Sequence, residues 1–199
     1  MLREVFGEAA FELLCRYSDI LASRGIDWGL LGPREVDRLW ERHIANSLAV
    51  GDLVPPGAHV VDVGSGAGLP GIPVAIARPD VRIVLLEPLL RRSNFLTQTV
   101  DELGITDHVT AQRARADEVR ATYDVVLSRA LAPLDRLIRW CLPLMRPSGQ
   151  IVAIKGASAR DEVARHERLI TGSGLMADVR TVSSDPRLPP ATVVRLTLR

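Results

Sequence analysis

Three acidic residues follow apolar stretches of the chain, and together they could bind a cationic ligand. Asp62 begins a glycine-rich run, Asp62-Val63-Gly64-Ser65-Gly66-Ala67-Gly68, at the end of the first such stretch. Glu87 closes the second stretch, and Asp117 lies in the connection after the third. Parallel strands end at one edge of a sheet, so we expect the three carboxylates to surround one binding site.

The glycine-rich run is compatible with two kinds of nucleotide site. Gly66 to Gly71 also satisfies G-x-G-x-x-G, the dinucleotide pattern, in which a pyrophosphate binds at the turn. A carboxylate at Asp62 would repel that pyrophosphate, but it would attract the sulfonium and ammonium groups of S-adenosylmethionine. We therefore predict a methyl-donor site whose turn is formed by Asp62, Gly64, Gly66 and Gly68.

Glu87 and Asp117 provide the other two predicted contacts with the donor. An acidic side chain at the end of the second strand can accept hydrogen bonds from both ribose hydroxyls, which is the role predicted for Glu87. Asp117 would meet the adenine amino group. Each acid also has a simpler explanation, which is helix capping for Asp62 and Glu87 and loop solvation for Asp117. Their joint placement favours the donor site.

Two cations, Arg129 and Lys155, are expected near the ends of later strands and are the candidate catalytic residues. Cations suit an RNA phosphate or a purine O6 acceptor and do not suit a general base. Cys15 and Cys141 fall within predicted helices and are interpreted as core residues, so no cysteine nucleophile is expected. The chain also lacks the Asn/Asp-Pro-Pro-aromatic turn typical of amino-group methylation. A ring nitrogen such as guanine N7 needs no base, because it carries a lone pair and no proton.

Composition restricts the class of protein. The chain has 199 residues, a net charge of +1 and 47% hydrophobic residues, which suits one globular domain and excludes a disordered chain. Two cysteines cannot form a disulfide framework, and no apolar stretch is long enough for a membrane span or a signal peptide. We expect a cytoplasmic monomer with no membrane contact and no metal site.

Basic residues are concentrated in the second half of the chain. In residues 129–168, eight Lys or Arg accompany four Asp or Glu. Such a surplus near a site suits a polyanionic partner, and Arg136, Arg139 and Arg165 are the candidate RNA-binding residues. A solvated helix face is an equally open interpretation of the same charges.

The elements that would position these residues follow from periodicity. Residues 1–50 are predicted to be helical, with a second helix over about 34–50. Pro55-Pro56-Gly57 separates an N-terminal helical extension, 1–57, from a Rossmann-like core, 58–199. The predicted strands are 59–63, 81–86, 109–112, 123–127, 150–154, 177–183 and 192–198. The predicted helices between them are 69–78, 89–103, 133–145 and 159–171, with a turn at 147–149. This alternation predicts one α/β domain over 1–199, whose mostly parallel sheet has an antiparallel edge.

The run from Asp62 to Pro73, Asp-Val-Gly-Ser-Gly-Ala-Gly-Leu-Pro-Gly-Ile-Pro, resembles the signature of the ribosomal RNA small subunit methyltransferase G family, also called glucose-inhibited division protein B. Arg42 to Leu48, Ser128-Arg129-Ala130 and Lys155-Gly156 agree with it in order and spacing. The resemblance implies a class I S-adenosylmethionine-dependent methyltransferase fold. It also implies methylation of N7 of guanine 527 in 16S ribosomal RNA, in the small ribosomal subunit or its precursor.

The resemblance also implies particular contacts. The donor would touch Gly64 and Leu69 in the glycine loop, Ala116 and Asp117 beside the adenine, and Arg129. One departure concerns Asn46, where the family usually has aspartate, so we interpret Asn46 as structural or RNA-facing. His43, on the same helix, is interpreted as a packed or capping residue.

Two other functions remain open at this level. One is a small-molecule methyltransferase of the same fold, which would have a closed apolar pocket and binding that is indifferent to salt. The other is a nucleotide-binding module without catalysis, such as one that uses NAD.

Overall fold

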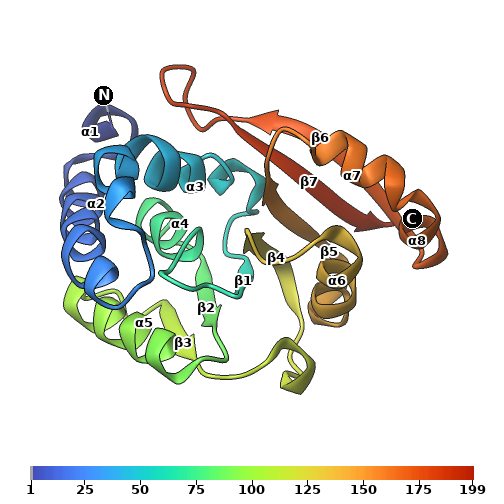
Figure 1. The fold of residues 1–199 in the computed structure, drawn as a ribbon, viewed down its shortest axis with the longest axis horizontal. Helices are drawn as coiled ribbons and strands as arrows, with labels where there is room; N and C mark the ends of the chain where they lie inside the picture. Colours follow the sequence, from blue (N-terminus) through green and yellow to red (C-terminus); the bar gives the residue numbers. More distant parts are fainter. Residues whose placement is uncertain (1) are drawn as a thin grey trace.

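Seven strands form one sheet at the centre of the computed structural model, which describes residues 2–199 (Figure 1). The strands are β1 (His59–Val63), β2 (Arg82–Leu86), β3 (Val109–Gln112), β4 (Tyr123–Arg129), β5 (Met145–Lys155), β6 (Leu175–Val182) and β7 (Ala191–Leu198). Their order in the sheet is β3-β2-β1-β4-β5-β7-β6. β1 to β5 are parallel, and β7 is antiparallel to both β5 and β6. The predicted fold class and its antiparallel edge are confirmed.

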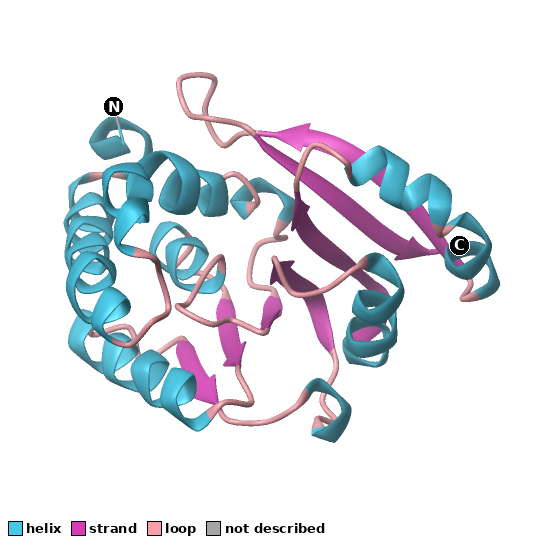
Figure 2. Ribbon diagram, in the orientation of Figure 1, coloured by secondary structure: helices cyan, strands magenta, loops and turns pink. Residues whose placement is uncertain are grey.

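Helices cover both faces of the sheet, which explains why its central strands are mainly apolar. Figure 2 shows helices on either side of the strands. Successive residues of a strand point to opposite faces, and Val60 and Val61 accordingly belong to two different buried clusters. One cluster includes residues of α4 (Gly71–Ala77) and α5 (Leu90–Leu103). The other includes residues of α6 (Leu134–Cys141), α7 (Ala159–Arg165) and α8 (Glu167–Gly172).

The N-terminal extension packs on the α4 and α5 side and shares its core. Leu14, Tyr17 and Leu21 are fully buried in the same cluster as the side chains of α4 and α5. They lie on and just after α2 (Glu8–Ile20), which follows the short helix α1 (Leu2–Phe6). The extension therefore contributes part of the hydrophobic core on one face of the sheet.

The second part of the extension is less regular than the single helix predicted for it. It begins with 3-10 turns over Pro33–Arg38, continues as a π-helical stretch over Leu39–Ala45, and ends in α3 (Asn46–Leu48). Gly32 precedes it in extended backbone and Pro33 is its first residue, a position that proline favours. The side chains of Leu39, Ile44 and Leu48 are buried, so tertiary packing holds a segment whose local geometry departs from an α-helix.

The predicted turn at residues 147–149 is wrong, because these residues lie inside β5. Tyr123 pairs with Met145 and Val125 pairs with Gln150, so two steps along β4 correspond to five along β5. The additional residues of β5 form a bulge, and pairing with β4 resumes at Gln150. A Cβ at Gly149 would lie 2.8 Å from the carbonyl oxygen of Asp124, so a glycine is needed where the strands approach.

Two predicted helices are also shorter than expected. The helix predicted over 159–171 is divided at His166 into α7 and α8. The helix predicted over 133–145 ends at Cys141, because Pro143 follows within a short 3-10 turn, Leu142–Leu144. No helix in residues 2–199 is long and apolar enough to cross a membrane.

Candidate functional site

A cavity of about 370 Å³ opens at the carboxyl ends of the parallel strands. Its size lies within the range of small-molecule sites in proteins. The residues that line it are Val63, Gly64, Leu86, Glu87, Pro88, Leu89, Arg92, Ala114, Arg115, Ala116, Asp117, Ala130, Leu131 and Trp140. Larger surface hollows lie elsewhere, one of them beside Pro55 to Ala58 at the opposite ends of the strands. Of the predicted cofactor-binding residues, Gly64, Glu87, Ala116 and Asp117 line this cavity.

Glu87 connects the glycine loop to the wall of the cavity. Its side chain is almost fully buried, directly after β2. Oε2 accepts a hydrogen bond from the backbone N–H of Gly66 at 3.1 Å, and Oε1 accepts one from the N–H of Leu89 at 3.1 Å. Each carboxylate oxygen has a second lone pair. Glu87 can therefore cap the following backbone and still accept hydrogen bonds from a ligand hydroxyl.

Asp62 lies beneath the glycine loop and is outside the cavity wall. Its side chain is fully buried, and Oδ2 accepts hydrogen bonds from Ser65 Oγ at 2.6 Å and from the N–H of Gly71 at 3.0 Å. Burial raises the pKa of Asp62 to about 6, against the opposing effect of these two donors. In this structure Asp62 shapes the loop and caps the start of α4, while a direct contact with the donor remains a prediction.

The glycine loop needs residues without side chains where it meets the rest of the wall. Gly64 has a φ of +70°, and a Cβ there would lie 2.4 Å from Cδ1 of Leu131. The loop is held from behind by α2, since the buried hydroxyl of Tyr17 donates a hydrogen bond to the carbonyl oxygen of Ala67 at 2.8 Å. Gly68 and Leu69 are buried on this inner side of the loop.

The arrangement of donors and acceptors disfavours a pyrophosphate at the turn. The N–H of Gly66 donates a hydrogen bond to Glu87, and the N–H of Gly71 donates one to Asp62. In a dinucleotide site the amides of this turn and helix start face the phosphates. Here both amides already donate to carboxylates, and a bound pyrophosphate would lie beside these two acidic groups. A ligand without phosphate, and with positive charge, fits these acceptors better.

Asp117 is at the exposed lip of the cavity. It lies on a short 3-10 turn, Ala116–Glu118, and its Oδ1 is 3.2 Å from Nε of Arg115. Its side chain is 63% exposed, so it can turn toward a ligand at little cost. Ala116 beside it provides an apolar part of the wall.

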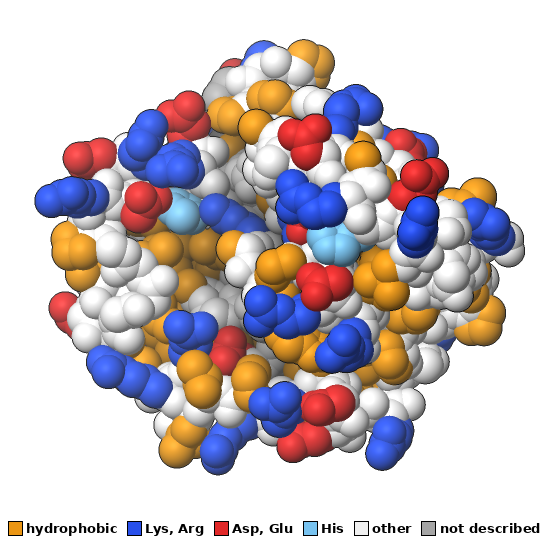
Figure 3. All heavy atoms as spheres, turned by 45° about the vertical axis from the view of Figure 1, so that its right-hand side comes forward, with side chains coloured by type: hydrophobic (Ala, Val, Ile, Leu, Met, Phe, Trp, Pro, Cys, Tyr) orange, Lys and Arg blue, Asp and Glu red, His pale blue; other side chains and the backbone are white. Residues whose placement is uncertain are grey.

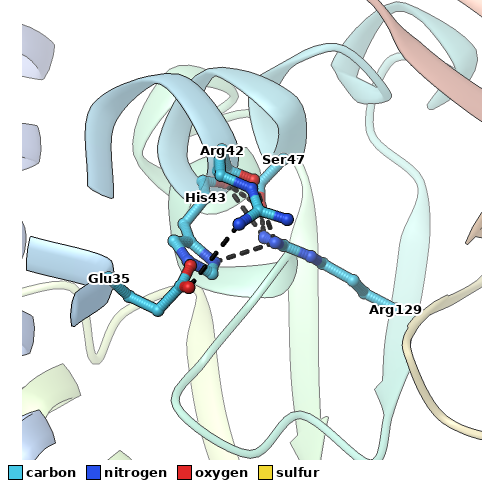
Figure 4. Close-up of polar contacts among 5 residues, drawn as sticks. All are labelled: Glu35, Arg42, His43, Ser47 and Arg129. Atoms are coloured by element: carbon cyan, nitrogen blue, oxygen red, sulfur yellow. Dashed lines mark hydrogen bonds and ion pairs between the residues drawn. The ribbon is translucent and has the colours of Figure 1, made fainter. Parts of the chain in front are cut away.

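Arg129 ends β4, and its side chain points toward Arg42, His43 and Ser47 of the N-terminal extension (Figure 4). Its Nη2 donates a hydrogen bond to the carbonyl oxygen of Arg42 at 2.9 Å, and Nη1 donates one to the carbonyl oxygen of His43 at 3.2 Å. The residues that follow it, Ala130 and Leu131, line the cavity. Arg129 is therefore next to the site through its backbone while its guanidinium is engaged elsewhere.

Lys155, at the end of β5, is similarly engaged by protein groups. Its Nζ donates to the carbonyl oxygen of Ala132 at 2.9 Å and forms an ion pair with Glu162 Oε1 at 3.0 Å. The same carboxylate oxygen accepts a hydrogen bond from the N–H of Leu134, at the start of α6. Lys155 therefore ties the loop after β4 to α7, and catalysis by it remains a prediction.

The three candidate RNA-binding residues are all exposed. Arg136 and Arg139 are on α6, opposite the face that buries Leu134, Leu137 and Ile138. Arg165 is at the end of α7. Figure 3 shows cationic side chains around a hollow on one face of the molecule, with acidic side chains among them. The exposure of these arginines suits both phosphate binding and a solvated helix face.

The two cysteines are not placed for nucleophilic chemistry. Cys141 is buried on α6, and burial raises its pKa to about 12. Cys15 is half-buried on α2 and burial raises its pKa as well. Neither residue lines the cavity, and both thiols stay protonated at neutral pH.

Sequence reasoning missed several residues of the site. Ala130 and Leu131 directly follow Arg129, so their place after a predicted strand was an available signal. Trp140, from α6, and Tyr17, from α2, carried no such signal, because helix residues reach a strand edge only through tertiary packing.

The sequence of this chain is similar to those of known proteins that share one family description. The family model described as rRNA small subunit methyltransferase G matches residues 10–187. A ribosomal RNA small subunit methyltransferase G of Mycolicibacterium paratuberculosis is 54% identical over 184 residues, covering 90% of this chain and 74% of the relative. The protein of the same name from Mycolicibacterium smegmatis is 52% identical over 195 residues, covering 96% and 82%.

Solved structures share the fold at low sequence identity. An S-adenosylmethionine-dependent methyltransferase in its apo form has a TM-score of 0.63 and 21% identity, covering 82% of this chain and 57% of that one. An O-methyltransferase from neocarzinostatin biosynthesis, in complex with S-adenosylmethionine, has a TM-score of 0.59 and 18% identity, covering 78% and 52%. The fold is the class I S-adenosylmethionine-dependent methyltransferase fold.

Glu87→Gln tests the acidic contact with the methyl donor. The variant keeps the size of the side chain but loses its charge, so we expect the dissociation constant for S-adenosylmethionine to rise about tenfold. Titration calorimetry measures this directly. Asp107→Asn, which removes the same charge at an exposed position outside the cavity, serves as the control. Equal affinity of the Glu87 variant and the parent chain would remove Glu87 from the site.

Asp62→Asn tests the buried charge through the pH dependence of stability. Because the pKa of Asp62 is raised to about 6, the folded state binds its proton more tightly than the unfolded state, and ionisation costs stability as pH rises through 4 to 6. Relative to the parent chain, the variant should gain about 2 kcal/mol of unfolding free energy between pH 4.5 and pH 7.5, measured by urea unfolding. Asp124→Asn should show no such gain over this range, since hydrogen bonds from His59 and Arg146 lower the pKa of Asp124 and it stays ionised from pH 4.5 to pH 7.5. A pH-independent difference for Asp62→Asn would contradict the buried-charge interpretation.

Proposed function

The chain belongs to the rRNA small subunit methyltransferase G family, and on this basis we propose that it methylates N7 of guanine 527 in 16S ribosomal RNA. It is an S-adenosylmethionine-dependent rRNA methyltransferase. Its partner would be 16S rRNA within the small ribosomal subunit or its precursor, which places the reaction in the cytoplasm. We propose that residues 1–199 act as one monomeric domain, with 1–57 as the extension and 58–199 as the core.

The assignment of the donor site is based on the cavity at the carboxyl ends of the strands. Its acceptors, Glu87 and Asp117, and its apolar wall residues suit an adenosine with no phosphate. Asp62 Oδ1 is buried and has no hydrogen-bond partner in the part of the chain that the structure describes, so an unsatisfied acceptor also lies under the loop. S-adenosylmethionine supplies an electrophilic methyl group on a positively charged sulfur. We propose that Glu87 binds the ribose, that Ala116 and Asp117 flank the adenine, and that Gly64, Gly66, Gly68 and Leu69 shape the turn beneath the methionine part.

No histidine or cysteine lines the cavity among the described residues, which supports a ring nitrogen as the acceptor. The lone pair of guanine N7 forms the new N–C bond as the S–C bond breaks, and no proton has to leave the base. Among the described residues at this edge, Lys155 forms an ion pair with Glu162, and both ring nitrogens of His43 have hydrogen-bond partners. The chain would act mainly by orientation, which suffices for a nucleophile that is already unprotonated.

Arg129 and Lys155 are the cations proposed to act beside the reacting base. A guanidinium or ammonium here would attract purine O6 or a neighbouring phosphate. In the structure both side chains donate to protein acceptors, so such a contact requires an exchange of partners when RNA binds. Arg129→Ala should therefore reduce activity by more than its effect on thermal stability explains.

The product of the reaction tests the proposed function. The chain is incubated with radiolabelled S-adenosylmethionine and small subunits from a strain that lacks its gene, in parallel with naked 16S rRNA. Nuclease digestion should give labelled 7-methylguanosine, and cleavage chemistry specific for 7-methylguanine should map it to position 527. Label in another nucleoside would refute guanine N7 as the acceptor, and label at another guanine would refute position 527. No label in either substrate would refute the proposed reaction.

Reversing charge on α6 tests the RNA-binding role of the exposed arginines. Arg136→Glu with Arg139→Glu should weaken binding of 16S rRNA and make the salt slope of log K shallower by about 0.7–0.9 for each phosphate that the protein no longer neutralises, while donor affinity stays unchanged. Arg82→Glu, at the exposed start of β2 on the opposite edge of the sheet, is the control. An unchanged salt slope would assign Arg136 and Arg139 to a solvated face.

A further inference from the structure

The guanidinium of Arg129 contacts a side chain as well as backbone carbonyls of the extension (Figure 4). Nη2 of Arg129 lies 2.8 Å from Nδ1 of His43, and Nη1 donates to Ser47 Oγ at 3.4 Å. Nε2 of His43 lies 2.8 Å from Oε2 of Glu35, whose other oxygen is 3.5 Å from Arg42. The imidazole therefore bridges an acid of the extension and the cation at the end of β4.

These contacts determine which nitrogen of His43 carries the proton. A guanidinium has only donors, so Nδ1 must accept the hydrogen bond from Arg129 with its lone pair. Nε2 then carries the proton, and this N–H group donates a hydrogen bond to the carboxylate of Glu35. One neutral tautomer satisfies both neighbours, and a doubly protonated ring would place a second donor and a like charge against Arg129.

The position of Arg129 affects the cavity through the two residues that follow it. Ala130 has a φ of +51°, a left-handed conformation that a residue with a side chain adopts only when its surroundings hold it there. Leu131 then packs against Gly64, where a Cβ would meet its Cδ1 at 2.4 Å. Ala130 and Leu131 both line the cavity, so the strained turn forms part of its wall.

We propose that His43 is a positioning residue for the methyl-donor cavity. The lone pair of its Nδ1 holds the guanidinium of Arg129 on the N-terminal extension, Glu35 fixes the required tautomer, and Arg129 in turn anchors the Ala130–Leu131 wall against Gly64. The inference rests on donor binding, and it does not depend on which RNA atom receives the methyl group.

The groups around His43 predict how this hydrogen bond responds to pH. Glu35 and Arg42 face the ring from its own segment and Arg129 faces it from β4, while Tyr17 of α2 and Asp62 of β1 act on Arg129. Burial, assisted by Arg129 and Arg42, lowers the pKa of His43 below 6.5 despite the hydrogen bond to Glu35. The ring is neutral at pH 7.5, and the hydrogen bond from Arg129 breaks as pH falls through the pKa of His43.

Two substitutions of His43 separate positioning from simple packing. His43→Asn keeps an amide oxygen near the place of Nδ1 and cannot titrate, whereas His43→Ala removes the acceptor. In calorimetry of the full chain with S-adenosylmethionine at pH 7.5, the alanine variant should have a dissociation constant about fivefold higher, and the asparagine variant should stay within about twofold of the parent chain. His108→Ala removes another partly buried imidazole, bonded to the carbonyl of Ala75, and should leave donor affinity unchanged.

The pH comparison provides the second measurement. As pH is lowered from 7.5 through the pKa of His43, located by NMR of its ring protons, the dissociation constant of the parent chain should rise about threefold more than that of His43→Asn. Titration of the donor and of Asp62, with its pKa of about 6, occurs in both proteins and cancels in the comparison.

Several results would overturn the proposal. These are an unchanged affinity in His43→Ala, an equal loss in two cooperatively folded His43 variants, or equal pH responses of the parent chain and His43→Asn. If the alanine variant does not fold, the comparison of His43→Asn with the parent chain decides. No RNA is used, so failure here leaves the guanine-N7 proposal to its own test.

Discussion

The buried carboxylate of Asp62 is the constraint on which the site depends. A charged group without access to water is costly unless donors surround it, and here Ser65 and the N–H of Gly71 converge on one oxygen. These two hydrogen bonds close the glycine loop and fix where α4 begins. The raised pKa of Asp62 indicates that this compensation is incomplete, so the loop retains an acceptor of strong negative potential. Such a loop suits a cationic ligand.

The N-terminal extension supports this loop and the end of β4. Tyr17 donates to the loop from α2, and the segment around His43 holds Arg129. Arg129 is also the positive charge that lowers the pKa of Asp62 and offsets part of its burial. The extension, the loop and β4 thus form one electrostatic unit beside the cavity. A change in the extension should therefore affect donor binding even though its helices do not line the cavity.

Elements that depend on local interactions agree with the prediction, whereas features that depend on contacts between distant segments do not. β3 was predicted with its observed bounds, Val109–Gln112, because its apolar pattern and flanking polar residues are local. The bulge that carries β5 through Pro147 and Gly149 was missed, since it depends on the approach of β4. The acids were correctly expected at one edge of the sheet, but their depths differ. Asp62 is fully buried, Glu87 lines the wall and Asp117 lies at the exposed lip, and only tertiary packing distinguishes these positions.

By itself the sequence determined the order of elements, the parallel sheet with its antiparallel edge, the location of a glycine turn beside an acid, and the resemblance that named the family. These depend on residue types at short spacing, which local backbone preferences and periodicity translate directly into structure. Only the tertiary structure decided the hydrogen-bond and ion-pair partners of each polar group. Arg129 points to the extension, Lys155 is paired with Glu162, and His43 bridges Glu35 and Arg129. Those partners come from segments far apart in the chain, and hydrogen bonds between them exist only after the hydrophobic core has brought the segments together.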